Sequence, residues 1–429
     1  MVVAPVSGAA PRPASSETDE WSRALLADGT GPELPQADPL ADGRRQARAA
    51  FAAHGLPSRR QEAWRFTPTD PITAVLPRRI AAGRPADPSS WPAPAPRTVR
   101  LVLDGSADPL AGAPLPDGIT VLSPAEWAGV PGTEAAARGG GDWPLLLNRA
   151  TASGLLALRV RGAVAETLEI VSDPGSAAGV LPLRLVLLLE EGASLELLQV
   201  HRAGGASLTS VVTEVRLASG ARLHHGLIAQ GHPAAVLLAH AAVAQEPGST
   251  YHLASSSRGW ALSRLEPRIE QTTGRAVTRL RGLQRAAGRE IADTHSRVRF
   301  GGPEGTLDQL HKAVADDASR SVFDGAVVVP REAQRTRAAQ LSRNLLLSER
   351  ARIDTKPQLE IVADDVTCTH GATVSRLQQE ELFYLRSRGI AADQAARLLL
   401  RGFCQEVLGE LPRAASPWLA AGTGEGSGR

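Results

Sequence analysis

Two residues with metal-binding side chains, Cys368 and His370, are separated by one threonine near the C-terminus. The surrounding residues favour an extended strand, in which residues i and i+2 point to the same face. The thiolate and the imidazole would then converge on one small volume, and these two ligand types suit zinc or iron. A closed metal site needs about four ligands, so the pair predicts half of a site.

Spacing alone leaves a second interpretation of this pair open, in which Cys368 is a small buried hydrophobic residue and His370 a turn residue. The carboxylates nearby do not decide the question. Asp364 and Asp365 are adjacent and therefore lie on opposite faces of a strand, so they do not form a glycosidase-type pair with each other.

The other histidines predict no second metal site. His224 and His225 are strand neighbours that point to opposite faces, so they do not hold one metal ion together. Cys404 is expected to be a core residue of a helix. Surface or hydrogen-bonded positions are expected for the histidines that are isolated in the sequence, which are His240, His252, His295 and His311.

The sequence contains no nucleophile elbow, no phosphate-binding glycine loop of the Walker type and no dinucleotide fingerprint. We therefore predict that the chain is not an enzyme. Lysine and arginine total 47 against 45 aspartate and glutamate residues, so no long-range field attracts nucleic acid or an anionic membrane. The chain has two cysteines, no N-x-[ST] site and no signal-peptide pattern, and we predict a cytoplasmic protein without nucleic-acid or membrane partners.

A repeat of turn glycines predicts the elements that position Cys368 and His370. The glycines recur at intervals of 28, 28, 26 and 28 residues, at Gly192, Gly220, Gly248, Gly274 and Gly302. Three residues after the first four lie Leu195, Leu223, Tyr251 and Val277. Strand-like runs at a fixed period, without intervening helices, favour a β-solenoid, although chance spacing of a common residue is the alternative. An aromatic content of 3% suits a core of thin aliphatic layers.

Five segments are expected along the chain. They are a flexible tail (1–17), an N-terminal helical region with a proline-rich linker (18–100), the solenoid core (101–374), a helical hairpin (375–412) and a second flexible tail (413–429). Ser375 and Gln378 predict a capping box for the first helix of the hairpin, and Gly389 its C-terminal cap. The second helix carries an apolar stripe formed by Leu399, Phe403, Val407 and Leu411.

The sequence resembles the SufB/SufD family, the scaffold proteins of the SUF iron-sulfur cluster assembly machinery. The C-terminal signature of that family is similar to TKPQLEIVADDVTCTHGATVSRL followed by LFYLRSRGI. The similarity extends upstream through QLHKAVADDASRSVFDGAVVV and QLSRNLLLSERARIDTKP. Near the N-terminus, GLPSRRQEAWRFTP looks like the opening signature of the SufD branch of the family.

This resemblance implies a right-handed parallel β-helix with N-terminal and C-terminal helical regions, in a complex with SufB and two copies of the ATPase SufC. The cysteine and histidine of the family motif C-x-HGAT carry over to Cys368 and His370. The resemblance thus implies a transient iron-sulfur cluster, or iron, at an interface where SufB supplies at least one further thiolate. Strands around 340–374 are expected to pair with SufB. The helical hairpin, with Leu399, Phe403 and Val407, is expected to dock SufC.

A homodimer and a flavin in the assembled complex are both compatible with the resemblance, and the sequence decides neither. Two other functions stay open. One is a purely structural interaction module whose metal role rests wholly in its partner. The other is a β-helix carbohydrate-active enzyme, which fits poorly because such enzymes typically bind sugars on aromatic platforms and this chain is poor in aromatic residues.

Overall fold

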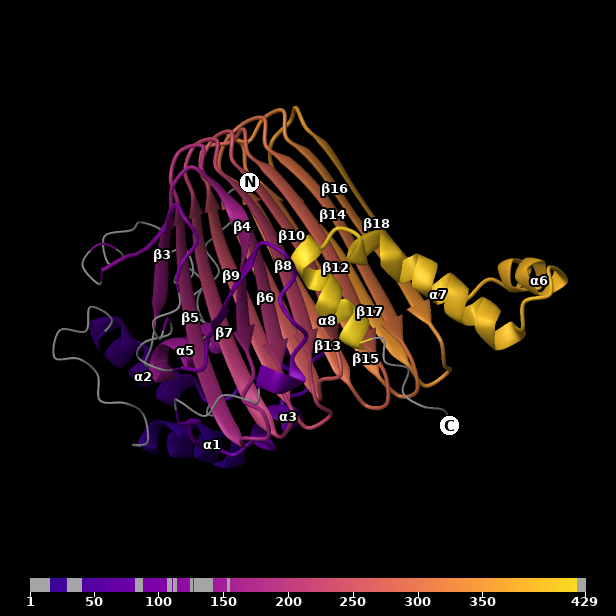
Figure 1. Ribbon diagram of the computed structural model, residues 1–429, viewed down its shortest axis with the longest axis horizontal. Helices are drawn as coiled ribbons and strands as arrows, with labels where there is room; N and C mark the ends of the chain where they lie inside the picture. The colour runs from indigo at the N-terminus through magenta and orange to yellow at the C-terminus, as the bar shows by residue number, and fades with distance from the viewer. Residues whose placement is uncertain are drawn as a thin grey trace, which may run out of the picture.

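The chain forms a parallel β-solenoid with helices against both of its outer faces (Figure 1). The computed structural model describes residues 16–28, 41–81, 88–105, 110, 114–123, 126, 142–152 and 155–422. The strands build two nine-stranded sheets, and from β3 onward the chain alternates between the sheets. The solenoid predicted from the glycine repeat is therefore confirmed. Among the described helices, none is both long and apolar enough to cross a bilayer.

The two sheets are named A and B. Sheet A contains, in spatial order, β17 (Arg352–Ile361), β15 (Arg320–Val329), β13 (Ile291–Phe300), β11 (Leu262–Gln271), β9 (Val236–Gln245), β7 (Ser207–Leu217), β5 (Gly179–Leu189), β3 (Leu156–Val160) and β2 (Ile119–Val121). Sheet B contains β1 (Thr98–Val102), β4 (Ala163–Ser172), β6 (Ser194–Arg202), β8 (Arg222–Gln230), β10 (Thr250–Arg258), β12 (Val277–Ala286), β14 (Thr306–Ala315), β16 (Arg337–Leu346) and β18 (Thr367–Ser375). The pairing of β2 with β3 is antiparallel, and the other pairings are parallel.

Glycine turns of successive rungs lie above one another. Gly192, Gly220 and Gly248 have φ angles of 68°, 70° and 73°, in the left-handed region that residues with a Cβ atom rarely adopt. Each turn also bonds to the next one, since Gly192 N donates to Ser219 O at 3.0 Å and Gly220 N to Pro247 O at 3.1 Å. Identical turns therefore recur at an identical spacing, which is the period seen in the sequence.

The repeat slips by one residue at the fourth glycine. Val277 and Tyr251 both lie three residues after a turn glycine but are not in the same column, because Val277 pairs with Thr250 and its side chain is 43% exposed. Thr278 pairs with Tyr251 instead and is buried. The interval before this turn is shorter than the others, so the first inward-facing position comes one residue later.

Aliphatic side chains such as Leu183 and Leu197 fill the space between the sheets. In the later rungs, buried amide side chains share this interior, and Gln284, Gln309 and Gln340 are each at most 4% exposed. These amides form hydrogen bonds to one another or to hydroxyl groups. Polar side chains are buried in the earlier rungs as well, where Gln199 bonds to Thr213 and to His225, so the interior is aliphatic with hydrogen-bonded polar groups along its length.

The N-terminal helices cover the outer face of sheet A (Figure 1). They are α1 (Ser16–Ala27), α2 (Ala41–His54), η1 (Glu62–Trp64), α3 (Asp70–Thr73) and α5 (Trp143–Thr151); a further turn, η2 (Pro88–Ser90), follows α3. Trp143 is at the centre of their contact, with ring centroids 5.5 Å from Phe51 and 6.2 Å from Trp64. Apolar residues of sheet A, including Val236 and Leu262, complete this cluster.

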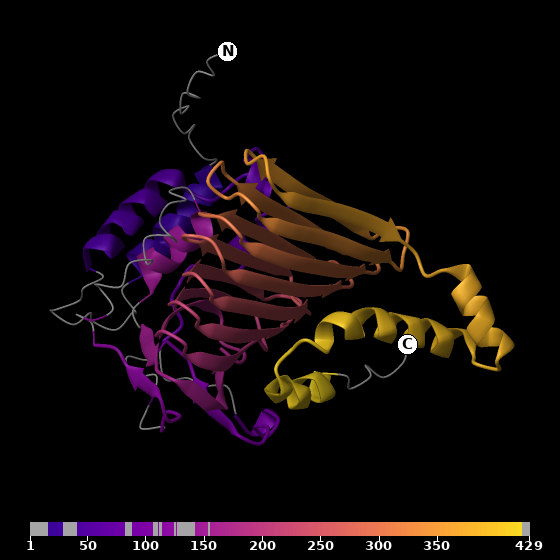
Figure 2. The same ribbon diagram turned by 90° about the horizontal axis from the view of Figure 1, so that it is seen from above.

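The C-terminal helices are α6 (Gln379–Ser387), α7 (Ala392–Leu408), η3 (Arg413–Ala415) and α8 (Ser416–Gly422). The C-terminal half of α7 packs on the outer face of sheet B, whereas α6 stands away from both sheets (Figure 2). Gly389 has a φ of 82°, as predicted for a helix cap. The predicted capping box is absent, because Ser375 belongs to β18 and the N-cap Gln378 makes no side-chain cap bond.

Residues 413–422 are helical and packed, where a flexible tail was expected. Trp418 is 1% exposed and packs with Leu198 and Ile228 of sheet B, while its indole N–H donates to Glu169. Burial of this aromatic ring outweighs the glycine-rich composition that follows it. The predictions for residues 1–15 and 423–429 lie outside the described residues.

Candidate functional site

Cys368 and His370 lie on β18, the last strand of sheet B. On one side β18 pairs with β16, where Ala338 is opposite Cys368 and Gln340 is opposite His370. Ala338 and Gln340 are buried in the interior of the solenoid, at 4% and 2% exposure. The cysteine and the histidine therefore share the inward-facing side of their strand, as predicted, and extend the interior columns by one rung.

The two side chains differ in exposure. Cys368 is half-buried and packs against the apolar core, whereas His370 is exposed. Burial raises the pKa of the Cys368 thiol, and a backbone hydrogen bond involving Ala338 only partly opposes this effect. At neutral pH the thiol is therefore protonated in the chain alone. A metal ion or a positive partner must displace that proton before the sulfur can act as a ligand.

The neighbouring carboxylates do not complete a ligand set around Cys368. Glu360 lies on β17 and is 3.9 Å from Arg297, and the side chains of Asp364 and Asp365 are exposed in the turn before β18. Within the described ranges, no third side chain of the types that bind metals joins Cys368 and His370. The chain thus presents two ligands at an edge of the solenoid.

A second group of potential ligands is buried under the N-terminal region. Ligand atoms of Asp142, His240 and Glu266 all lie within 4.8 Å of one another. Arg268 already donates to both carboxylates, at 2.6 Å to Asp142 and 2.9 Å to Glu266, and the Arg264 guanidinium donates to the other oxygen of Glu266. Because arginines occupy the oxygens that a cation would use, this group is an ion-pair network.

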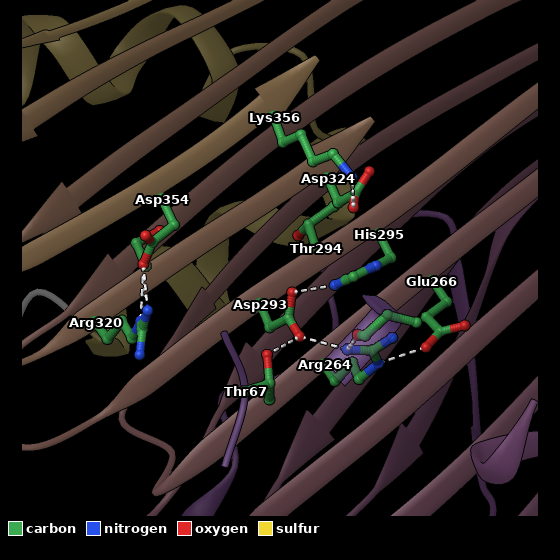
Figure 3. Close-up of polar contacts among 12 residues, drawn as sticks. Thr67, Arg264, Glu266, Asp293, Thr294, His295, Arg320, Asp324, Asp354 and Lys356 are labelled. Atoms are coloured by element: carbon green, nitrogen blue, oxygen red, sulfur yellow. Dashed lines mark hydrogen bonds and ion pairs between the residues drawn. The ribbon is translucent and has the colours of Figure 1, made fainter. Parts of the chain in front are cut away.

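The ion-pair network continues along sheet A (Figure 3). Arg264 Nη1 donates to Asp293 at 2.6 Å, and Asp293 also accepts the hydroxyl of Thr67 at 2.6 Å and lies 3.0 Å from His295. Thr67 belongs to the stretch GLPSRRQEAWRFTP, so the network attaches that stretch to the solenoid. Its members are distant in the sequence, and no spacing signal there brings them together.

The remaining histidines fit the expectations for them only in part. His225 faces the interior, 3.0 Å from the Tyr251 hydroxyl, whereas His224 faces outward and stacks on His252 with ring centroids 4.5 Å apart. The prediction that His224 and His225 point to opposite faces is confirmed. The expectation of a surface or hydrogen-bonded position is wrong for His311, which is 2% exposed, stacks on Phe323 and leaves its Nε2 without a hydrogen-bond partner. Cys404 is also buried, in the cluster between α7 and sheet B, as predicted.

The apolar stripe of α7 faces the solenoid of its own chain. Val407 is fully buried there, and Phe403 is half-buried beneath Lys312, whose ammonium lies 4.2 Å from its ring centroid. Leu399 is half-buried. Other apolar side chains of this region are exposed, namely Phe383 at 72%, Tyr384 at 58% and Leu398 at 50%. Sequence reasoning missed these three residues, although two of them belong to the stretch LFYLRSRGI.

Comparisons with known proteins give a consistent result. The family model described as "SUF system FeS cluster assembly, SufBD core domain" matches residues 173–403. An iron-sulfur cluster assembly SufBD family protein of Synechocystis is 37% identical over 241 residues, which are 54% of this chain and 53% of the relative. The iron-sulfur cluster assembly protein SufD of Escherichia coli is 28% identical over 92% of both chains, and that of Bacillus subtilis 44% identical over 24% of both. The chain thus spans about half the length of the Synechocystis relative.

Proposed function

The chain belongs to the SufBD core family of the SUF system for iron-sulfur cluster assembly, and we propose that it is a non-catalytic scaffold subunit of that system. In this proposal it pairs with SufB, docks the ATPase SufC and contributes Cys368 and His370 to a nascent cluster. The observation that carries the proposal is the place of both residues on the last strand of sheet B. ATP hydrolysis is assigned to SufC because this sequence has no phosphate-binding loop.

The C-terminal end of the solenoid supports pairing with SufB. Strands β17 and β18 end their sheets, so each exposes a row of backbone donors and acceptors that no strand of the described chain covers. Three of the large apolar side chains that are exposed lie at this end, with Ile361 at 40%, Val362 at 61% and Val374 at 45%. Addition of a SufB strand to this edge would satisfy the backbone groups and bury the apolar side chains.

The incomplete ligand set also favours an interface. Two ligands on one chain hold iron weakly, and a closed tetrahedral site needs about two more. In the proposal SufB provides at least one further thiolate, so the cluster is a substrate that forms only when the two chains meet. The protonated state of Cys368 in the chain alone agrees with a site that is completed late.

The test of the metal role is the iron and acid-labile sulfide content of the complex after co-expression with SufB and SufC. We expect His370→Ala to assemble and hydrolyse ATP while it loses most of both, and Cys368→Ala to change in the same direction by a smaller amount. Thr369→Ala is the matched control, because Thr369 lies between them on the opposite face of β18. Wild-type iron and sulfide in the His370→Ala complex would make the chain a structural partner only.

We place SufC on the exposed apolar residues of α6 and α7 instead of the predicted stripe. Phe383 and Tyr384 belong to α6, the helix that projects from the sheets (Figure 2), and Leu398 belongs to the first half of α7. The double substitution Phe383→Asp and Tyr384→Asp is expected to reduce capture of SufC in a pull-down at least tenfold. Gln405→Asp adds one negative charge at an exposed position of α7, where the double variant adds two, and is expected to leave capture intact. Undiminished capture by the double variant would contradict this placement.

A further inference from the structure

Gln340 is the neighbour of His370 in the preceding rung of the solenoid, and its side chain points into the interior. The two residues are opposite each other in the pairing of β16 with β18, on the inward-facing side of both strands. Gln340 is 2% exposed, so its amide is shielded from water although the histidine beside it is exposed. A buried polar side chain at this position needs hydrogen-bond partners within the protein.

The side-chain amide of Gln340 has a hydrogen-bond partner in the preceding rung, on β14, and none toward β18. Its Nε2 donates to Gln309 Oε1 at 2.9 Å, and Gln309 Nε2 donates in turn to the Ser296 hydroxyl at 2.7 Å. This chain of donors determines the direction of both amides. The carbonyl oxygen Oε1 of Gln340 is left buried without a hydrogen-bond partner.

The glycine at position 325 is part of the same arrangement. A Cβ atom placed on Gly325 would lie 2.5 Å from Gln340 Nε2, so any other residue there would displace the amide. The side chain of Gln340 thus extends across the interior from sheet B to sheet A, where it occupies the space left by the missing side chain of Gly325. The space at Gly325 and the hydrogen bonds through Gln309 hold the Gln340 amide in place, and its oxygen remains as one unused acceptor.

We propose that Gln340 is a positioning residue for His370, with Gln340 Oε1 accepting the N–H of one imidazole nitrogen so that the other nitrogen is free to bind iron. This inference rests on the proposed function of His370. A metal-binding histidine almost always donates its second ring nitrogen to a carbonyl or carboxylate, which selects the tautomer and the ring orientation. In this proposal the acceptor for that bond is the unused amide oxygen of Gln340, the residue opposite His370 in the pairing of β16 with β18.

The tautomer of His370 gives a direct test that requires no cluster. The full chain is labelled with ¹⁵N at histidine, and the His370 ring signals are assigned by their loss in His370→Ala. We expect one neutral tautomer to exceed about nine-tenths in the wild-type chain. Gln340→Met keeps the size of the side chain but removes the acceptor, and is expected to give a mixture of both tautomers. Gln340→Glu retains an acceptor and should restore the single form.

Gln284→Met is the matched control for damage to the interior. Gln284 is also buried, at 1% exposure, and its amide bonds to Thr294 and Ser321 several rungs from His370. We expect this variant to keep the wild-type tautomer of His370. Equal tautomer populations in the wild-type and Gln340→Met chains would overturn the inference.

Iron content separates this inference from the proposed function. In the complex with SufB and SufC, Gln340→Met is expected to lower the affinity for iron about tenfold without preventing assembly. If His370→Ala loads iron normally, the proposed metal role fails. If His370→Ala loses iron but Gln340→Met keeps wild-type loading, only the positioning role fails.

Discussion

Arg264 is the centre of the contact between the N-terminal signature and the solenoid, and its removal gives the sharpest stability prediction. Its guanidinium is 1% exposed, bonds to Glu266 and Asp293, and donates to Ala63 O at 2.9 Å. The same group lies 4.2 Å from the centroid of the Trp64 ring. Substitution by leucine removes the positive charge from between two buried carboxylates.

The size of the effect follows from the partners that remain. Removal of one member of a buried ion pair costs about 3–5 kcal/mol. Glu266 keeps Arg268 at 2.9 Å and Asp293 keeps the Thr67 hydroxyl at 2.6 Å, which favours the lower end of this range. We therefore expect Arg264→Leu to cost about 3 kcal/mol, most of it in the attachment of residues 62–67.

Native-state hydrogen exchange measures this attachment. The amides of Trp64 and Thr67 donate within the segment, and an opening that costs about 3 kcal/mol less would exchange them on the order of 100-fold faster. Burial acts to raise the pKa of Glu266, but Arg264 leads the groups that hold it well below its ordinary value. The difference in exchange rate between Arg264→Leu and the wild type should therefore be largest at neutral pH, where Glu266 is ionised. It should become smaller in acid, once the Glu266 carboxylate is protonated.

The exposed ion pair between Arg275 and Glu304 provides the control. Arg275→Leu removes an exposed ion pair with Glu304, at 69% and 40% side-chain exposure, and is expected to change the free energy of unfolding by less than about 1 kcal/mol. Unchanged exchange at residues 62–67 in Arg264→Leu would refute the view that the buried network holds the N-terminal signature in place.

Three further outcomes are expected. Burial lowers the pKa of His225 and of His311 to about 3. Below about pH 6.5 the unfolded state therefore binds more protons than the folded state. At pH 5 each of these histidines lowers the free energy of unfolding by roughly 2 kcal/mol. His311→Phe should flatten the fall in urea midpoint between pH 7 and pH 5, and an equal fall in both proteins would contradict this. Gly226→Ala places a Cβ atom 2.4 Å from Pro412 Cδ, and faster trypsin cleavage of residues 409–418 is expected; wild-type cleavage would show that the segment adapts freely. Lys312 is 3% exposed, and its ammonium donates at 2.8 Å to the main-chain carbonyl of Phe403 in α7. Lys312→Met should therefore raise the rate of hydrogen exchange in α7 by roughly tenfold. An unchanged rate would show that apolar packing alone holds the helix.

Several features were readable from the sequence because they depend on neighbours along the chain. Alternation along a strand places Cys368 and His370 on one face and separates His224 from His225. The left-handed turn at Gly389 follows equally from local backbone preference. The solenoid period was visible for the same reason, because each rung repeats one local pattern of strand and turn.

Tertiary structure decided which side chains of different rungs meet. A slip of one residue places Thr278, and not Val277, beside Tyr251, and the spacing from the turn glycines does not reveal such a slip. The stripe of α7 was expected to dock SufC, but contact with sheet B of the same chain buries Val407, while Phe383 of α6 stays exposed. The place of Gln340 behind His370 depends on the length of the whole last coil. These contacts are set by the stacking of rungs about 30 residues apart, which the sequence encodes only through the summed lengths of strands and turns.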